Sequence, residues 1–196
     1  MTLLVLGLVL FLGTHSFSMA RGARAALIGR TGLGAFKGLY SLLSLAGIVL
    51  IAIGYGQYRE SSYVPVWDPP VWSRHLALLL VLVAFVCFAA AYLPGHIKHR
   101  LKHPMLAGVK IWAFAHLLAN GDLGSILLFG SFLAWAVAAR ISVKRRDVAA
   151  QHGGTAAPAG WRNDMLAVAI GGIAYVAFVL WLHPRVIGVP VLPMGA

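Results

Sequence analysis

The hydrophobic residues of this chain fall into long runs that are separated by short polar or basic segments. A helix that crosses a hydrocarbon core of about 30 Å needs roughly twenty apolar residues, so runs of this kind predict membrane-spanning helices. The pattern therefore predicts an all-α, polytopic transmembrane helical bundle with about six spans. These spans are residues 2–20, 36–58, 72–93, 104–119, 123–139 and 164–183, of which 104–119 is short and contains Lys110.

Three of the segments between the runs have a distinctive composition. Residues 59–71 are rich in proline and aromatic residues, which predicts a non-helical outside loop and is compatible with an interfacial lid. Asn120, Gly121 and Asp122 form a tight-turn signal between two runs, so the flanking helices are expected to form an antiparallel hairpin. Residues 149–160 are rich in glycine and alanine and predict a flexible cytoplasmic linker inside a single domain, 1–196.

The composition excludes a soluble protein and changes how the charge is interpreted. The chain is 60% hydrophobic and only 11% charged, with a mean hydropathy of +0.84. A net charge of +11 would suggest a nucleic-acid partner in a soluble protein. Thirteen of the sixteen Lys and Arg residues, however, lie in the connections that face the cytoplasm if both termini are outside. We therefore expect the lipid bilayer as the partner and no nucleic acid.

Two histidines fall inside the predicted spans and are the first candidates for chemistry, because ionisable groups in a membrane are costly. His15 lies six residues before Arg21, and His116 lies six residues after Lys110. If both basic residues mark the inner boundary, both imidazoles lie about 9 Å inside the membrane at the same level. Two neutral imidazoles on different helices are suited to axial ligation of a haem iron. The alternative is that both histidines form hydrogen bonds between helices.

The remaining polar residues give weaker signals. His96, His99 and His103 are spaced three and four residues apart, which is compatible with a metal site on one helical face. The neighbouring lysines and arginine favour a basic interfacial surface instead. Asp122 is expected to cap the following helix, and Asp164 to be an N-terminal charge on the last one. His75 and His183 lie at outer span ends, and the single cysteine, Cys87, excludes an intrachain disulfide and a covalent haem attachment.

Several motifs together resemble the NnrU family of bacterial membrane proteins. The resemblance is carried by residues 102–123, by Leu39–Leu42 with Gly54–Gly56, and by Phe129–Trp135. It implies a multi-pass protein of the bacterial inner (cytoplasmic) membrane that is associated with denitrification. It also implies a relationship to zeta-carotene isomerase, a haem b membrane enzyme.

The isomerase pattern coincides with the two intramembrane histidines. His15-Ser16 matches its early His-Ser pair, and Trp112 to His116 matches its Trp-x-x-x-His stretch, which follows His103-Pro104. The resemblance thus implies haem b as cofactor, with His15 and His116 as axial ligands of the iron. Ala113 stands where the isomerase has a cysteine that exchanges as iron ligand, so ligand exchange by that route is not expected here.

Two functions follow as expectations, and no catalytic residue is assigned for either. The first is denitrification-linked redox or isomerase chemistry on haem b. The alternative is a non-catalytic membrane accessory for the assembly or maturation of nitric oxide or nitrite reductase, whose components would be its partners. A small transporter ranks last, because the spans contain no carboxylates for coupling.

Overall fold

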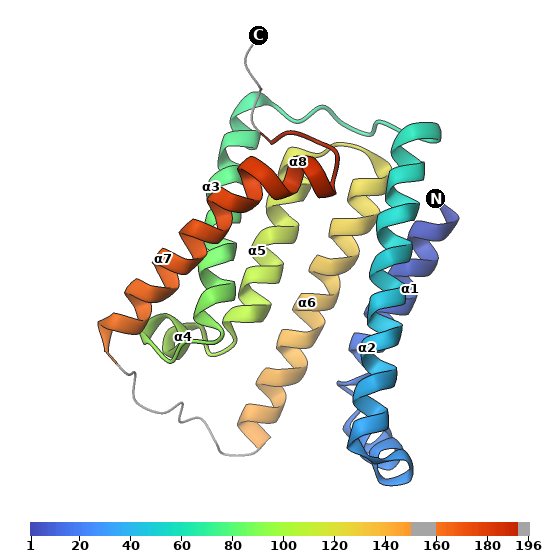
Figure 1. Ribbon diagram of the computed structural model, residues 1–196, viewed down its shortest axis with the longest axis vertical. Helices are drawn as coiled ribbons and strands as arrows, with labels where there is room; N and C mark the ends of the chain where they lie inside the picture. The colour runs from blue at the N-terminus through green and yellow to red at the C-terminus, as the bar shows by residue number, and fades with distance from the viewer. Residues whose placement is uncertain (150–159, 192–196) are drawn as a thin grey trace.

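The computed structural model describes residues 1–149 and 160–191, and these residues form helices joined by short connections (Figure 1). The predicted linker 149–160 falls outside the described residues except for its two ends, Ala149 and Gly160. The elements are α1 (Thr2–Phe17), α2 (Arg21–Ser61), α3 (Val71–Ala90), α4 (His96–Leu101), α5 (Pro104–Ala119), α6 (Leu123–Ala149), α7 (Trp161–Ala177), the π-helix η1 (Phe178–Leu182) and α8 (His183–Val186). The all-α class predicted from the sequence is confirmed.

The six long helices pack in an order that differs from their order along the chain. Helix α1 packs against α2 and α6, α5 packs against α6 and α3, and α7 packs against α3. The helices therefore follow one another in space as α2, α1, α6, α5, α3 and α7 (Figure 1). Helix α6 lies between α1 and α5, so it is the shared neighbour of the two helices that carry the candidate histidines.

The expectation of six spanning helices is wrong by the criterion of length. Four helical segments of the described chain are long and apolar enough to cross a membrane: residues 21–61, 71–90, 123–146 and 161–186. Helices α1 and α5 are apolar but only 16 residues long. Sixteen residues rise about 24 Å, which is less than the hydrocarbon thickness of about 30 Å. The apolar run overestimated the length of α1, because it included residues 18–20, which follow the end of the helix at Phe17.

Helix α2 begins much earlier than its apolar run predicts. Residues 21–35 were expected to be a connection, yet the helix extends from Arg21 to Ser61 with a break at Gly32, where φ is +81°. Glycine tolerates this left-handed conformation, which other residues rarely adopt. The segment before the break contains alanines, leucine and arginines, which are good helix formers. A search for long apolar runs does not detect a helix of this polar composition.

The loop between α2 and α3, residues 62–70, is fixed to the turn between α5 and α6. The backbone N–H groups of Val66 and Trp67 donate to the carbonyl of Gly121 at 2.8 and 3.0 Å, and Leu123 N–H donates to the carbonyl of Val64 at 2.9 Å. The tight turn at 120–122 and the α5–α6 hairpin are confirmed. The loop contains no helix between residues 62 and 70, although α2 occupies Arg59 to Ser61. These backbone bonds hold the segment against the bundle.

Glycines allow α1 and α2 to approach each other closely. A Cβ on Gly7 would lie 2.6 Å from the backbone nitrogen of Ile51, and one on Gly47 would lie 2.9 Å from the backbone nitrogen of Phe11. A Cβ on Gly54 would overlap the backbone of Leu3 and Leu4 in the same way. Small residues at such positions are typical of membrane helix pairs, because they permit backbone contact.

This seam predicts that Gly54→Val lowers stability, whereas Gly56→Val does not. A side chain at 54 must push α1 away, and overpacking of this kind costs about 1–3 kcal/mol. Gly56 is on the same helix, and nothing lies within 4 Å of a Cβ built there. Thermal unfolding in detergent measures both variants. Equal unfolding temperatures for the two would contradict the assigned α1–α2 contact.

Candidate functional site

His15 lies in the last turn of α1 among aromatic side chains. Its Nδ1 is 2.8 Å from the carbonyl oxygen of Phe11, one turn earlier. Because a carbonyl only accepts, this contact requires the proton on Nδ1 and leaves a lone pair on Nε2. The ring stacks on Phe11 at 4.1 Å between centroids and also contacts Tyr40 at 5.2 Å and Trp135 at 5.8 Å.

His116 is held in the same manner one turn before the end of α5. Its Nδ1 is 2.8 Å from the carbonyl oxygen of Trp112, so its Nε2 also carries the free lone pair. The ring stacks on Phe129 at 4.4 Å and lies 5.1 Å from the Trp112 ring. Ligating histidines commonly donate their other ring N–H to a backbone carbonyl, which fixes the tautomer. Both candidates are therefore preset with Nε2 as the donor.

An aromatic stripe on α6 connects the two histidines. The ring of Trp135 contacts His15 and the ring of Phe129 contacts His116. Between them, Phe132 lies 5.5 Å from the ring of Phe11 and 5.5 Å from that of Trp112. The two imidazoles thus pack against α6, one from α1 and the other from α5. No contact between the two imidazole rings is seen.

The expectation that both histidines lie at one level of the bundle is wrong. It took Lys110 as the inner boundary of the helix, but α5 begins at Pro104, six residues earlier. Six residues correspond to a rise of about 9 Å. The α6 residues that the two rings contact, Trp135 and Phe129, are also six positions apart. Lys110 lies inside the helix and marks no boundary.

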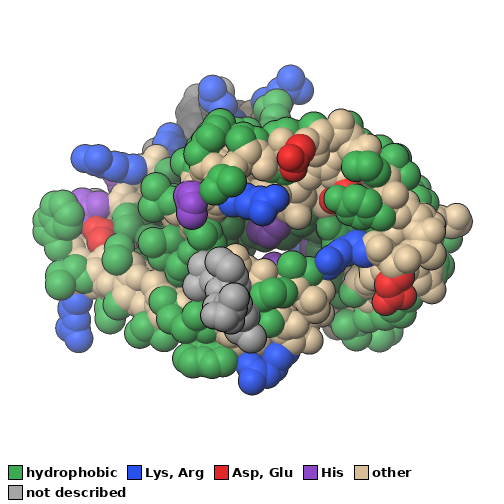
Figure 2. Space-filling view, turned by 90° about the horizontal axis from the view of Figure 1, so that it is seen from above, with side chains coloured by type: hydrophobic (Ala, Val, Ile, Leu, Met, Phe, Trp, Pro, Cys, Tyr) green, Lys and Arg blue, Asp and Glu red, His purple; other side chains and the backbone are tan. Residues whose placement is uncertain are grey.

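The side chains around the histidines are of the kinds that contact a flat apolar macrocycle with polar substituents. The two imidazoles provide the donor atoms, and the aromatic side chains of α6 provide the apolar contacts. The indole N–H of Trp135 and one guanidinium nitrogen of Arg140 are buried without a hydrogen-bond partner in the described chain. Buried donors usually have partners, and the ring of Trp135 contacts His15, so its indole N–H is suited to a bound group with acceptor oxygens. Seen from the end of the bundle that carries α8, the molecule is hollowed at its centre, and histidine side chains are visible there (Figure 2).

The alternative metal site on His96, His99 and His103 does not form. Helix α4 ends at Leu101, and Lys102 adopts a φ of +60°, so the three residues do not share one helical face. Within residues 1–149 and 160–191, no group of three or more His, Cys, Asp or Glu side chains is arranged to hold a metal ion. The break at Lys102 explains why the spacing alone was misleading.

His96 instead belongs to a junction with Asp164 that the sequence did not reveal. The carboxylate of Asp164 accepts the backbone N–H of His96 at 3.0 Å, that of Ile97 at 2.9 Å and the His96 Nδ1–H at 2.7 Å. The Trp161 ring lies 4.9 Å from the His96 ring. Asp164 is in the first turn of α7 as expected, but it caps α4, a helix 68 residues away along the chain.

Asp122 caps α6 as expected and anchors a buried polar chain. Its Oδ1 accepts the backbone N–H of Ser125 at 2.9 Å, and its Oδ2 accepts the Ser125 hydroxyl at 2.6 Å. With that proton committed, the Tyr55 hydroxyl donates to Ser125 Oγ across 2.6 Å. Asp122 and Ser125 are 4% and 0% exposed, so this chain joins α2 to α6 inside the protein.

A third histidine shares the arrangement of His15 and His116. His183 follows the π-helix Phe178–Leu182, and its Nδ1 is 2.7 Å from the carbonyl oxygen of Val189. Sequence reasoning assigned it to an outer span end. The local signal for an irregular helix here was Pro184, which cannot donate a helical hydrogen bond. π-Helical turns such as Phe178–Leu182 often lie at functional sites.

The comparison with known proteins agrees with the motifs. Residues 3–191 match the protein family that is described as NnrU protein, which is nearly the whole chain. No curated protein and no solved structure matches the chain. The matched range includes both candidate histidines and the helices described above, except for Thr2 at the start of α1. The chain therefore belongs to the NnrU family.

Proposed function

We propose that this protein is a haem b protein of the bacterial inner membrane, with His15 and His116 as axial ligands of the iron. Because the α6 residues that the two rings contact lie six positions apart, ligation of one iron by both requires the two side chains to move toward each other when haem binds. The observation that supports the proposal is the common state of the two imidazoles. Each donates Nδ1–H to a carbonyl of its own helix at 2.8 Å and keeps Nε2 free, and both pack on the aromatic stripe of α6. An isolated interhelical hydrogen-bonding role would require each Nε2 to have a partner on another helix.

The side chains around the two histidines have separate tasks in this proposal. Phe129, Phe132 and Trp135 supply apolar contact area for the tetrapyrrole. The free N–H donor of Trp135 is suited to one of its carboxylates, since buried donors require acceptors. The bound haem would supply one-electron redox or Lewis-acid chemistry, and the apolar walls would limit the access of water to the iron.

The reaction class that we propose is denitrification-linked redox or isomerase chemistry. Ala113 of α5 is fully buried in the hydrophobic core and occupies the position of the exchangeable cysteine in the isomerase pattern. Alanine has no donor atom, so a change of ligand at this position is not part of the proposal. The orientation that we propose places the end of the bundle that contains α4 and the α1–α2 link in the cytoplasm, because basic residues gather there, and both termini outside.

The visible absorption spectrum of the protein, purified in detergent after expression with added haem precursor, tests the proposal. We expect a Soret band and about one haem b per chain by pyridine haemochrome assay, because the ligands are preset in the fold. Protein that is folded by circular dichroism and yet lacks a Soret band after haem supply would refute it.

The alternative function is a non-catalytic accessory for the assembly or maturation of nitric oxide or nitrite reductase. One observation favours it: the buried polar side chains Ser73, Asp122, Ser125 and Asp164 all serve to hold helix ends or connections. This part of the interior therefore offers no spare acid or base. A deletion strain grown anaerobically on nitrate tests it. Reduced haem loading of either reductase is expected, and normal loading and activity would exclude it.

A further inference from the structure

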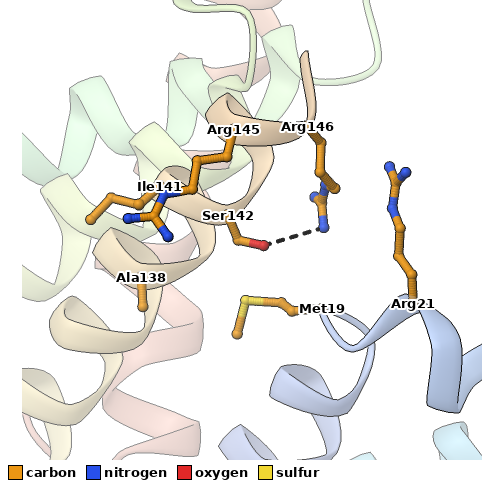
Figure 3. A pocket seen from close by; sticks show the side chains of 7 residues that line it. All are labelled: Met19, Arg21, Ala138, Ile141, Ser142, Arg145 and Arg146. Atoms are coloured by element: carbon orange, nitrogen blue, oxygen red, sulfur yellow. Dashed lines mark hydrogen bonds between the residues drawn. The ribbon is translucent and has the colours of Figure 1, made fainter. Parts of the chain in front are cut away.

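A pocket of about 510 Å³ lies just beyond the last turn of α1, the helix that carries His15, at the end of the bundle where α2 begins at Arg21 (Figure 3). It is located between the link that joins α1 to α2 and the last turns of α6. Its described lining residues are Met19 and Arg21 from the first segment and Ala138, Ile141, Ser142, Arg145 and Arg146 from α6.

The lining combines cationic and apolar side chains. Three guanidinium groups contribute from two separate segments, and no acid is among the described residues that line the pocket. Arg146 Nη1 makes one contact in the pocket, a 3.5 Å contact to Ser142 Oγ, which leaves most of its donors for another acceptor (Figure 3). Met19, Ala138 and Ile141 form the apolar part. Arg21 and Arg145 are exposed and Arg146 is partly buried, so all three guanidinium groups are accessible to an anion at this surface.

The position of the pocket identifies the kind of anion. Arg21 begins α2 just after α1 ends at Phe17, and Arg145 and Arg146 follow the apolar part of α6, so the pocket is at the membrane boundary of the bundle. Arginine forms bidentate, charge-assisted hydrogen bonds with phosphate groups. A free anion would use the arginines only, whereas a phospholipid would also use the apolar side chains.

We propose that this pocket binds the phosphodiester headgroup of an anionic phospholipid, with Arg21 and Arg146 as the main donors. The acyl chains would then lie along the apolar surface between α1 and α6. Basic pockets between membrane helices on the cytoplasmic side are known to bind anionic headgroups. The proposal is independent of haem binding, since no residue of the pocket contacts His15 or His116 in the aromatic cluster.

Native mass spectrometry of the full-length protein, with phosphatidylglycerol or phosphatidylcholine added in detergent, tests the proposal. We expect one tightly bound phosphatidylglycerol per chain. The double variant Arg21→Gln, Arg146→Gln should bind it about tenfold or more weakly, since each basic residue contributes on the order of 1 kcal/mol at an anionic surface. The matched control is Arg100→Gln, an exposed residue of α4 at the same end of the bundle, which should bind as wild type does.

Three results would overturn the proposal. They are equal binding of the two lipids, equal phosphatidylglycerol binding by the double variant and the wild type, and displacement of the lipid by millimolar inorganic phosphate. The last would identify a free-anion site. Circular dichroism verifies the fold of each variant. If the double variant fails to fold, the variant Arg21→Lys, Arg146→Lys replaces it, because lysine retains the charge but cannot form bidentate hydrogen bonds. This variant should bind phosphatidylglycerol with intermediate affinity. Wild-type affinity would contradict the assignment of Arg21 and Arg146 as donors.

Discussion

Replacing His116 with alanine is expected to remove haem from the purified protein. The side chain is packed between the rings of Phe129 and Trp112, and its Nδ1–H is held by a carbonyl, so the variant loses a preset donor. Loss of an outer-shell partner already weakens metal sites about 10–100-fold, and loss of a ligand should exceed that. The ratio of Soret absorbance to protein absorbance measures the effect.

Two controls separate ligation from general damage. His99→Ala changes an exposed histidine of α4 and should keep the wild-type haem content. His116→Gly should regain a Soret band when imidazole is added, because the free molecule can replace the missing side chain. A His116→Ala protein with unchanged haem content would show that the ligand is another residue, and His183, with the same Nδ1 arrangement, is the first to examine.

Replacing Asp122 with alanine is expected to destabilise the protein by about 3 kcal/mol, from loss of a helix cap and of buried hydrogen bonds. The variant leaves the Ser125 backbone N–H and hydroxyl without their acceptor and weakens the link to Tyr55. Both Asp122 and Ser125 are buried, so water cannot easily replace the carboxylate. Thermal or denaturant unfolding in detergent measures the change.

Asp68→Ala is the matched control for this effect. Asp68 is an exposed residue of the neighbouring loop between α2 and α3, and its replacement should change stability by no more than about 0.5 kcal/mol. Ser125→Ala should reproduce part of the Asp122→Ala effect, because it removes the hydroxyl that joins Asp122 to Tyr55. An Asp122→Ala protein as stable as the Asp68→Ala control would mean that the buried chain does not hold α6.

Local signals in the sequence predicted the parts of the fold that depend on neighbouring residues. The hydrophobic runs located the long helices, and Asn120–Gly121–Asp122 predicted the α5–α6 hairpin together with its cap. The runs did not predict helix 21–31, because its alanines and arginines form a helix without a long apolar stretch. They also could not distinguish a 16-residue apolar helix from a full span, since helix ends depend on caps and on tertiary contacts.

In the candidate site, too, the sequence indicated single residues but not the contacts between distant segments. The sequence predicted the two histidines from the high cost of placing ionisable groups in lipid. Two features depend on contacts between residues far apart in the chain, so no local pattern indicates them. They are the packing of both histidines on the aromatic stripe of α6 and the Asp164–His96 junction. The two histidines lie at different levels because Lys110 is inside α5, which begins six residues earlier at Pro104.

Electron paramagnetic resonance of the ferric protein, reconstituted with haem in detergent, tests the central claim most directly. Two neutral imidazoles that bind one iron from His15 and His116 produce a low-spin ferric signal, and His15→Ala should convert this signal to a high-spin one while haem remains bound. A wild-type spectrum that is high-spin, or a low-spin spectrum that His15→Ala and His116→Ala both leave unchanged, would contradict ligation by this pair.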